Sequence, residues 1–134
     1  MARDYFKKTA ICNVGAIAID SDALIWPLFT APNAVKITAI RLGTNTTMTK
    51  ADTNYNTFTI KNGTVSVATL ANGPNSAAGT TIAAGVMGTF TVVTAAGANE
   101  LAAGDLLTLT SVKTGNGLAV VAAVIEIDYY DYNA

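Results

Sequence analysis

Short runs in which apolar residues alternate with threonine dominate this sequence and constrain its fold most. In 57–61, the apolar Phe58 and Ile60 fall on one side of an extended chain, while two threonines and a lysine fall on the other. Two further segments, 89–92 and 107–110, share this alternation with threonine. In 124–130 the period is also two, with Ile125, Ile127 and Tyr129 opposite Val124, Glu126, Asp128 and Tyr130. Successive side chains of a β-strand point to opposite faces, so this pattern predicts half-buried antiparallel strands with threonine on the wet side.

Clusters of Pro, Gly, Asn and Asp separate these runs and divide the chain into about eight expected strands. The expected ranges are 9–19, 23–30, 34–42, 55–61, 64–71, 87–95, 105–113 and 118–130. Asn62-Gly63, between two of them, is the strongest short hairpin signal, because both central residues of a type I′ turn need positive φ. The best helical candidate, 75–86, is interrupted by Gly79 and Gly85. The sequence therefore predicts an all-β, single-domain antiparallel structure, a β-sandwich or barrel of about eight strands with one pair of layers.

The alternation changes phase within the third expected strand. Val35, Ile37 and Ala39 lie on one parity. Ile40 and Leu42 lie on the other. A β-bulge near Ala39 explains this change, because one extra residue restores the later apolar side chains to the same face. Burial of the strand on both faces is the alternative.

The charge content of the chain points to its class of partner. Only 13% of the 134 residues are charged and the formal net charge is −1, against about 25% charged residues in an average protein. A nucleic-acid-binding surface needs a clustered basic face, which this sequence lacks. No apolar stretch approaches the roughly 20 residues of a membrane span. The low charge favours a subunit whose surface is partly covered by its own copies or by a larger assembly.

The first eight residues, MARDYFKK, are polar and basic with two aromatics. They predict an extended N-terminal arm, 1–8, followed by one β-sandwich domain, 9–134. A basic start before an apolar run resembles a signal peptide, but Asp4, Asn13 and Gly15 interrupt that pattern. No signal peptide is expected.

Side chains for covalent or acid–base catalysis are scarce. The sequence has no histidine and one cysteine, Cys12, within an apolar run. A catalytic thiolate needs an activating base such as histidine, so Cys12 is expected to be a small buried hydrophobe. The serine and threonine hydroxyls lack the same base. We therefore expect no enzymatic activity, no catalytic residue and no cofactor.

Two acidic patterns could bind a cation. Asp52-x-Asn54-x-Asn56 has the spacing that opens a calcium loop, but Thr57 stands where that loop needs glycine and Gly63 where it needs glutamate. An Asx-rich loop entering a strand is the favoured interpretation, and no metal is expected.

The second pattern is a group of three carboxylates near the C-terminus: Glu126, Asp128 and Asp131. Two carboxylates on one strand face could serve acid–base chemistry or bind a cation. More often such groups form a solvated face or pair with a neighbouring Lys or Arg.

Aromatic residues supply the candidate interaction surface. Trp26 fits either the core or an interface, where tryptophan is favoured as an anchor. In Tyr129-Tyr130-x-Tyr132, one tyrosine should pack inward and another face out. Aromatics in an arm need a partner surface to bury them. The candidate interface residues are Arg3, Tyr5, Phe6, Lys7, Lys8, Trp26, Tyr130 and Tyr132.

The middle and end of the chain resemble a known group of proteins. The segments that carry the resemblance are ITAIRLGTN (37–45), ADTNYNTFTIKNG (51–63), VATLA (67–71), GTTIAAGV (79–86), ELAAGDLLTLTSVKTGNGLAV (100–120) and VIEIDY (124–129). They are similar to small all-β virion proteins of tailed phages, namely head decoration (cement) proteins and related head-fibre bases.

This resemblance implies a jelly-roll-like or Greek-key β-sandwich. It also implies a non-catalytic protein that docks on the outside of an assembled bacteriophage capsid and stabilises it. Its partners would be the major capsid protein and its own copies, commonly as a homotrimer, with neither nucleic acid nor membrane involved. The chain would be made in the host cytoplasm and reside on the capsid exterior of the virion. The arm 1–8 would strap onto a neighbour by strand addition or aromatic anchoring. The alternative is a phage fibre or surface-adhesin module that binds a receptor or glycan.

Overall fold

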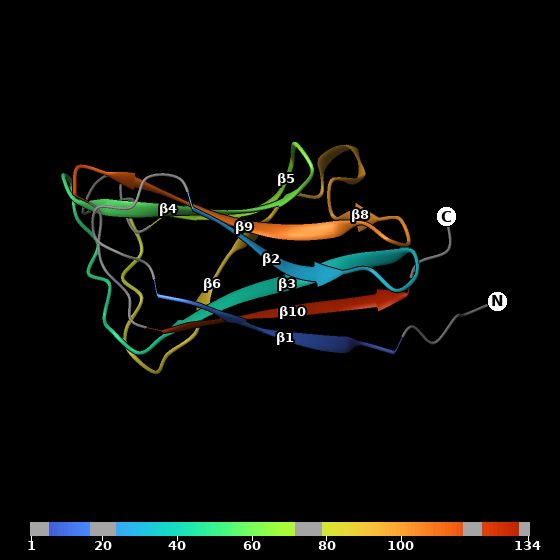
Figure 1. Cartoon of the computed structure of the whole chain (residues 1–134), viewed down its shortest axis with the longest axis horizontal. Helices are drawn as coiled ribbons and strands as arrows, with labels where there is room; N and C mark the ends of the chain where they lie inside the picture. Colours follow the sequence, from blue (N-terminus) through green and yellow to red (C-terminus); the bar gives the residue numbers. More distant parts are fainter. Residues whose placement is uncertain (1–5, 17–23, 72–78, 117–121, 132–134) are drawn as a thin grey trace.

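The chain forms a sandwich of two antiparallel β-sheets (Figure 1). The computed structural model describes residues 6–16, 24–71, 79–116 and 122–131. The first sheet, called the β1 sheet, has the order β1-β10-β3-β6, with β8 also paired to β3. Its strands are β1 (Lys8–Val14), β3 (Val35–Thr44), β6 (Gly88–Thr89), β8 (Glu100–Leu101) and β10 (Ala123–Asp131). The expected all-β sandwich is confirmed.

The second sheet, called the β2 sheet, has the order β2-β9-β4-β5-β7. Its strands are β2 (Leu24–Thr30), β4 (Tyr55–Asn62), β5 (Val65–Ala71), β7 (Thr91–Val92) and β9 (Leu106–Thr114). The late strands β9 and β10 lie between early ones, which is connectivity of the Greek-key kind. A 3-10 turn, Ala95–Gly97, is the helical element of the described residues, so none of their helices is of membrane-spanning length.

The strand expected at 87–95 is divided between the two sheets. β6 pairs with β3 in the β1 sheet, and β7 pairs with β5 in the β2 sheet. Phe90 lies between them, with its side chain buried and its backbone N–H donating to the Ile40 carbonyl over 2.9 Å. Burial of this aromatic ring between the sheets turns one expected strand into a crossing segment. The short strand β8 has no counterpart among the expected ranges.

Two expected strand ends also differ. β1 stops at Val14 rather than continuing to 19, and residues 17–19 lie outside the described residues. β10 begins at Ala123, and residues 118–121 of its expected start also lie outside them.

A β-bulge in β3 accounts for the phase change seen in the sequence. Asp128 pairs with Ala39 and Tyr129 pairs with Ile37, which leaves Thr38 as the extra residue. All four apolar residues around the bulge are fully buried: Val35, Ile37, Ile40 and Leu42. The bulge near Ala39 is therefore confirmed, and it keeps both halves of β3 facing one core.

The core lies between the inner faces of the two sheets. From the β2 sheet, Phe58, Ile60 and Leu109 are 0% exposed. From the β1 sheet, Ile125 and Ile127 are equally buried. These side chains are the apolar members of the alternating runs, so the period of two correctly identifies the buried face.

The hairpin expected at Asn62-Gly63 joins β4 to β5, one residue out of the predicted register. Asn62 pairs with Val65, so Gly63 and Thr64 are the central residues. Gly63 has φ +60°, whereas Thr64 is not among the described residues with positive φ. The turn is therefore not type I′, which needs positive φ at both central positions.

Deletion of Thr38 tests the bulge. We expect the deletion variant to lose only about 1 kcal/mol of unfolding free energy, because removal of the extra residue leaves a regular strand in which Val35 and Ile37 still face the core and the Thr38 hydrogen bond is lost. Thr38→Ala keeps the backbone and removes only the hydroxyl, so it should also cost about 1 kcal/mol. Urea unfolding measures both, and a loss of several kcal/mol in the deletion variant would contradict the bulge, because deletion from a regular strand turns its apolar side chains toward solvent.

Candidate functional site

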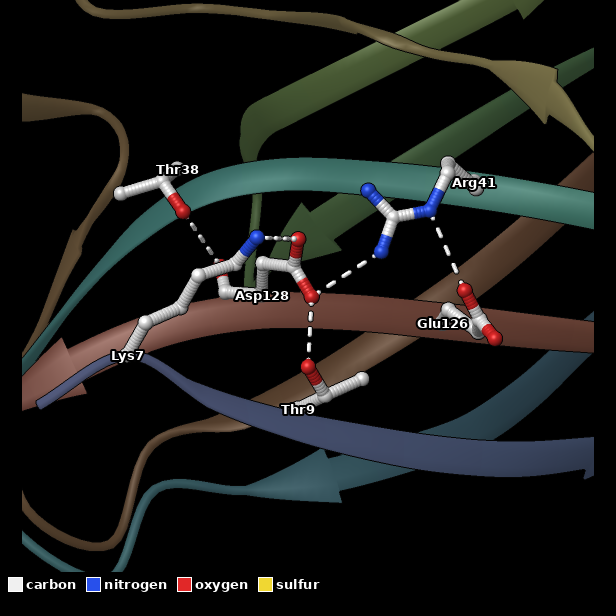
Figure 2. Close-up of polar contacts among 6 residues, drawn as sticks. All are labelled: Lys7, Thr9, Thr38, Arg41, Glu126 and Asp128. Carbon is white, nitrogen blue, oxygen red and sulfur yellow. Dashed lines mark hydrogen bonds and ion pairs between the residues drawn. The ribbon is translucent and has the colours of Figure 1, made fainter.

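A connected group of polar side chains surrounds Asp128 on the outer face of the β1 sheet (Figure 2). Thr9 Oγ1 donates to Asp128 Oδ1 over 2.7 Å, and Arg41 Nη2 lies 3.0 Å from the same oxygen. Lys7 Nζ lies 2.8 Å from Oδ2. The Asp128 side chain is only 1% exposed. We call this group the Asp128 cluster; its members are Lys7, Thr9, Thr38, Arg41, Glu126 and Asp128.

Strand register brings the cluster together. Thr9 in β1 and Ala39 in β3 are the direct neighbours of Asp128 in β10. The bulge residue Thr38 donates its hydroxyl to the Asp128 carbonyl oxygen over 3.2 Å. Arg41 faces Glu126 across the β3–β10 pair. The bulge that completes the core therefore also brings Thr38 into the cluster.

Two opposing effects set the pKa of Asp128. Burial raises it, because a charged carboxylate loses hydration. Hydrogen bonds from Lys7, Thr9 and Arg41, together with the positive charge of Arg41, outweigh burial and lower the pKa from its ordinary 3.8 to about 2. Asp128 is therefore a fixed anion at neutral pH and unsuited to donating a proton in catalysis.

The other two acidic residues of the C-terminal group also pair with cations of the same chain. Arg41 Nε donates to Glu126 Oε2 over 3.1 Å. Lys8 Nζ donates to Asp131 Oδ2 over 2.7 Å. Pairing with Lys and Arg, the ordinary interpretation of this group, is thus confirmed. The first pair links β3 to β10, and the second fastens the beginning of β1 to β10.

The predicted arm of residues 1–8 is partly engaged with its own domain. Lys8 is the first residue of β1 and pairs with Tyr129 of β10, and Lys7 contacts Asp128. Phe6, in contrast, is 79% exposed. Three other candidate interface residues lie outside the described residues: Arg3, Tyr5 and Tyr132.

The remaining aromatic candidates have different environments. Trp26 is half-buried, packs against the core and pairs with the buried Leu109. Tyr129 is buried, with its ring centroid 4.9 Å from that of Phe29 in the opposite sheet. Tyr130 is half-buried on the outer side of β10. One tyrosine inward and the next outward is the expected alternation.

Cys12 joins the two edge strands and offers no reactive thiolate. Its Sγ donates to the Leu28 carbonyl oxygen over 3.1 Å, which links β1 to β2. Burial raises the pKa of the Cys12 thiol, so the protonated form is favoured. The half-buried packing of Cys12 against the core agrees with its expected role as a small hydrophobe.

The Asx-rich segment around Asn54 and Asn56 supports the local backbone. Asn54 Oδ1 accepts a hydrogen bond from the Asn116 backbone N–H over 3.0 Å. Asn56 is buried and its Nδ2 donates to Ser111 Oγ over 3.4 Å. Among the described residues, no group of three or more His, Cys, Asp or Glu side chains could hold a metal ion. These side chains stabilise a loop, as the favoured interpretation expects.

A hollow of about 480 Å³ lies at one end of the β1 sheet. It is lined by Asn13, Gly43, Thr44, Asn45, Gly85, Met87, Ala122, Ala123 and Val124. Thr44 and Asn45 already use their side-chain oxygens in hydrogen bonds with backbone groups. Asn13 is the other residue with a polar side chain among the described residues that line the hollow.

The outer face of the β2 sheet has a different character. Thr110, Thr59, Thr69 and Thr91 are direct neighbours across β9, β4, β5 and β7, and Ile25 of β2 extends the same row. We call this surface the threonine face. Its residues are Ile25, Pro27, Thr57, Thr59, Lys61, Ser66, Thr69, Thr91, Leu106, Thr108, Thr110 and Val112.

The two sheets differ in their content of charged residues. The strands of the β1 sheet carry the charged residues Lys8, Lys36, Arg41, Glu100, Glu126, Asp128 and Asp131. The strands of the β2 sheet carry Lys61 and Lys113. Sequence reasoning did not single out this surface, because threonine on an alternating strand is the ordinary wet side of a sheet. The lack of acidic residues in all five segments of the β2 sheet is the signal that could have found it.

Comparison with models of protein families gives no match for this chain, and neither curated proteins nor solved structures give a significant one.

Asp128→Asn tests the Asp128 cluster. We expect this variant to lose about 2–4 kcal/mol of unfolding free energy at pH 7, because Lys7 and Arg41 lose a buried ionic partner. Asp131→Asn is the matched control on the same strand. Its pair with Lys8 is exposed, at 45% and 42%, so its loss should stay below about 1 kcal/mol. Urea unfolding at neutral pH compares the two.

The pH dependence provides a second measure of the cluster. Because the pKa of Asp128 is lower in the folded chain than in the unfolded one, its stabilisation is complete above about pH 4. It is lost as the pH falls through about 2. The wild type should therefore lose stability more steeply than Asp128→Asn over this range. Equal slopes for the two chains would contradict the assignment.

Proposed function

We propose that this chain is a non-catalytic structural protein of a tailed-phage virion. It binds the outer surface of the assembled capsid and stabilises it, as a decoration or cement protein. Its partners are the major capsid protein and further copies of itself, in a homotrimer. The resemblance of residues 37–129 to such proteins motivates this proposal, and the arrangement of polar groups supports it.

One observation carries most of the weight: the acidic group near the C-terminus, the candidate for acid–base chemistry in the sequence, is paired within the described part of the chain. The three C-terminal carboxylates pair with Lys7, Lys8 and Arg41. The part of the described chain that remains available for binding a partner is its surface, including the broad and nearly uncharged threonine face. A protein of this kind acts through many copies, each with modest contacts, and the capsid lattice supplies avidity.

The proposed strap is confined to the start of the chain. Lys7 and Lys8 form ion pairs with Asp128 and Asp131 of the same chain. Their side chains therefore attach the arm to its own domain and not to a neighbouring copy. Phe6 is the exposed aromatic side chain among the described residues. Contact with a neighbouring copy would therefore begin at Phe6.

The alternative, a receptor- or glycan-binding module, has less support. It expects an exposed aromatic platform with polar loops, with Trp26 or Tyr130–Tyr132 as candidates, and Tyr132 lies outside the described residues. Trp26 packs against the core and Tyr130 is half-buried.

Binding to undecorated, expanded phage heads tests the proposed function. Purified, labelled protein should occupy the heads saturably and symmetrically in electron micrographs, and unlabelled protein should displace it. No binding to heads, combined with binding to cell-wall sugars, would favour the adhesin alternative and reject the proposal.

A further inference from the structure

The threonine face differs from the rest of the described surface in having one charged residue, Lys61. Lys61 lies between Thr108 of β9 and Ser66 of β5. It forms no ion pair with any described residue, whereas Lys7, Lys8, Lys36 and Arg41 each contact a carboxylate of the chain. Lys61 is thus an unpaired cation on an otherwise uncharged surface.

The composition of this face matches the centre of a protein interface. Ile25, Val112 and Leu106 are 67%, 47% and 43% exposed, and threonine hydroxyls surround them. The centres of interfaces are depleted in charged residues, while hydroxyl groups can donate and accept hydrogen bonds across them.

The threonine face is also large enough to form a substantial part of a protein–protein interface. The five strands of 7, 9, 8, 7 and 2 residues, at about 3.3 Å per residue and about 4.8 Å spacing, give a surface of roughly 500 Å². A standard interface buries about 800 Å² on each partner. The threonine face can therefore account for most of one such interface.

Charge complementarity identifies the occupant. Two copies joined by this face would bring two lysines and no described carboxylate into the interface. A partner surface with exposed carboxylates would pair with Lys61 and leave the hydroxyl rows to bond to its polar groups. A carboxylate-bearing partner therefore fits this face better than a second copy does.

We propose that the threonine face is the surface that docks onto the capsid, and that it meets a carboxylate-bearing protein surface there. This inference rests on the proposed function. It leaves the outer face of the β1 sheet, with its internally paired charges, turned away from the lattice.

Two isoleucines provide a matched test. Ile25 and Ile11 are each 67% exposed and lie on the edge strands β2 and β1, one on the outer face of each sheet. Ile25→Asp should weaken head binding by roughly tenfold or more, because it buries an unpaired carboxylate in the interface. Ile11→Asp should leave head binding unchanged. Thermal unfolding of both variants verifies that each remains folded.

Charge reversal supplies the second pair. Lys61→Glu should also weaken head binding by roughly tenfold, since like charges then face each other. Lys50→Glu, at an exposed position in the loop before β4, should have no effect. Light scattering of each free variant reports its oligomeric state.

The outcomes separate the two proposals. Loss of head binding in Ile25→Asp and Lys61→Glu, with both controls intact, supports this docking face. If Ile25→Asp and Lys61→Glu bind heads as strongly as the wild type does, the docking face is wrong and the proposed function still holds. The same conclusion follows if Ile11→Asp loses head binding. Dissociation of a free oligomer by Ile25→Asp assigns the face to a second copy and overturns the inference. Absence of wild-type head binding overturns both proposals.

Discussion

Burial of one apolar layer between two sheets is the constraint on which the rest of the structure depends. β3 satisfies it only because Thr38 is bulged, which keeps Val35, Ile37, Ile40 and Leu42 in the same core. The same bulge places Thr38 beside the Asp128 carbonyl oxygen. Asp128 lies on the outer face because its neighbours Ile127 and Tyr129 face the core, and regular pairing puts it beside Arg41 and the first residues of β1. The core and the charged cluster therefore meet at one backbone irregularity.

The Asp128 cluster also makes the outer face of the β1 sheet different from the outer face of the β2 sheet. Asp128 can be almost fully buried and ionised because Lys7, Thr9 and Arg41 surround it. Such pairs stabilise the domain only while every partner is present, since a buried carboxylate left alone is costly. The outer face of the β1 sheet therefore serves the chain itself. The β2 sheet has no comparable network, and its outer face is free to meet another surface.

The sequence predicts local features of this fold well and non-local ones poorly. Alternation locates the long strands and their buried sides, and the phase change in β3 locates its bulge to within one residue. The division of 87–95 around Phe90 could not be foreseen, because it depends on where a second sheet lies. The same holds for the Asp128 cluster, in which Thr9 and Asp128 are 119 residues apart. Their contact depends on the pairing of the first strand with the last.

A reconstruction of phage heads saturated with this chain tests the central claim most directly, since it shows which face of the sandwich meets the lattice. The account predicts that β2, β9, β4 and β5 lie against the capsid, with Lys61 beside a carboxylate of the major capsid protein. The Asp128 cluster should then face away from the shell. A reconstruction with the outer face of the β1 sheet on the capsid, and the threonine face open to solvent, would contradict the account.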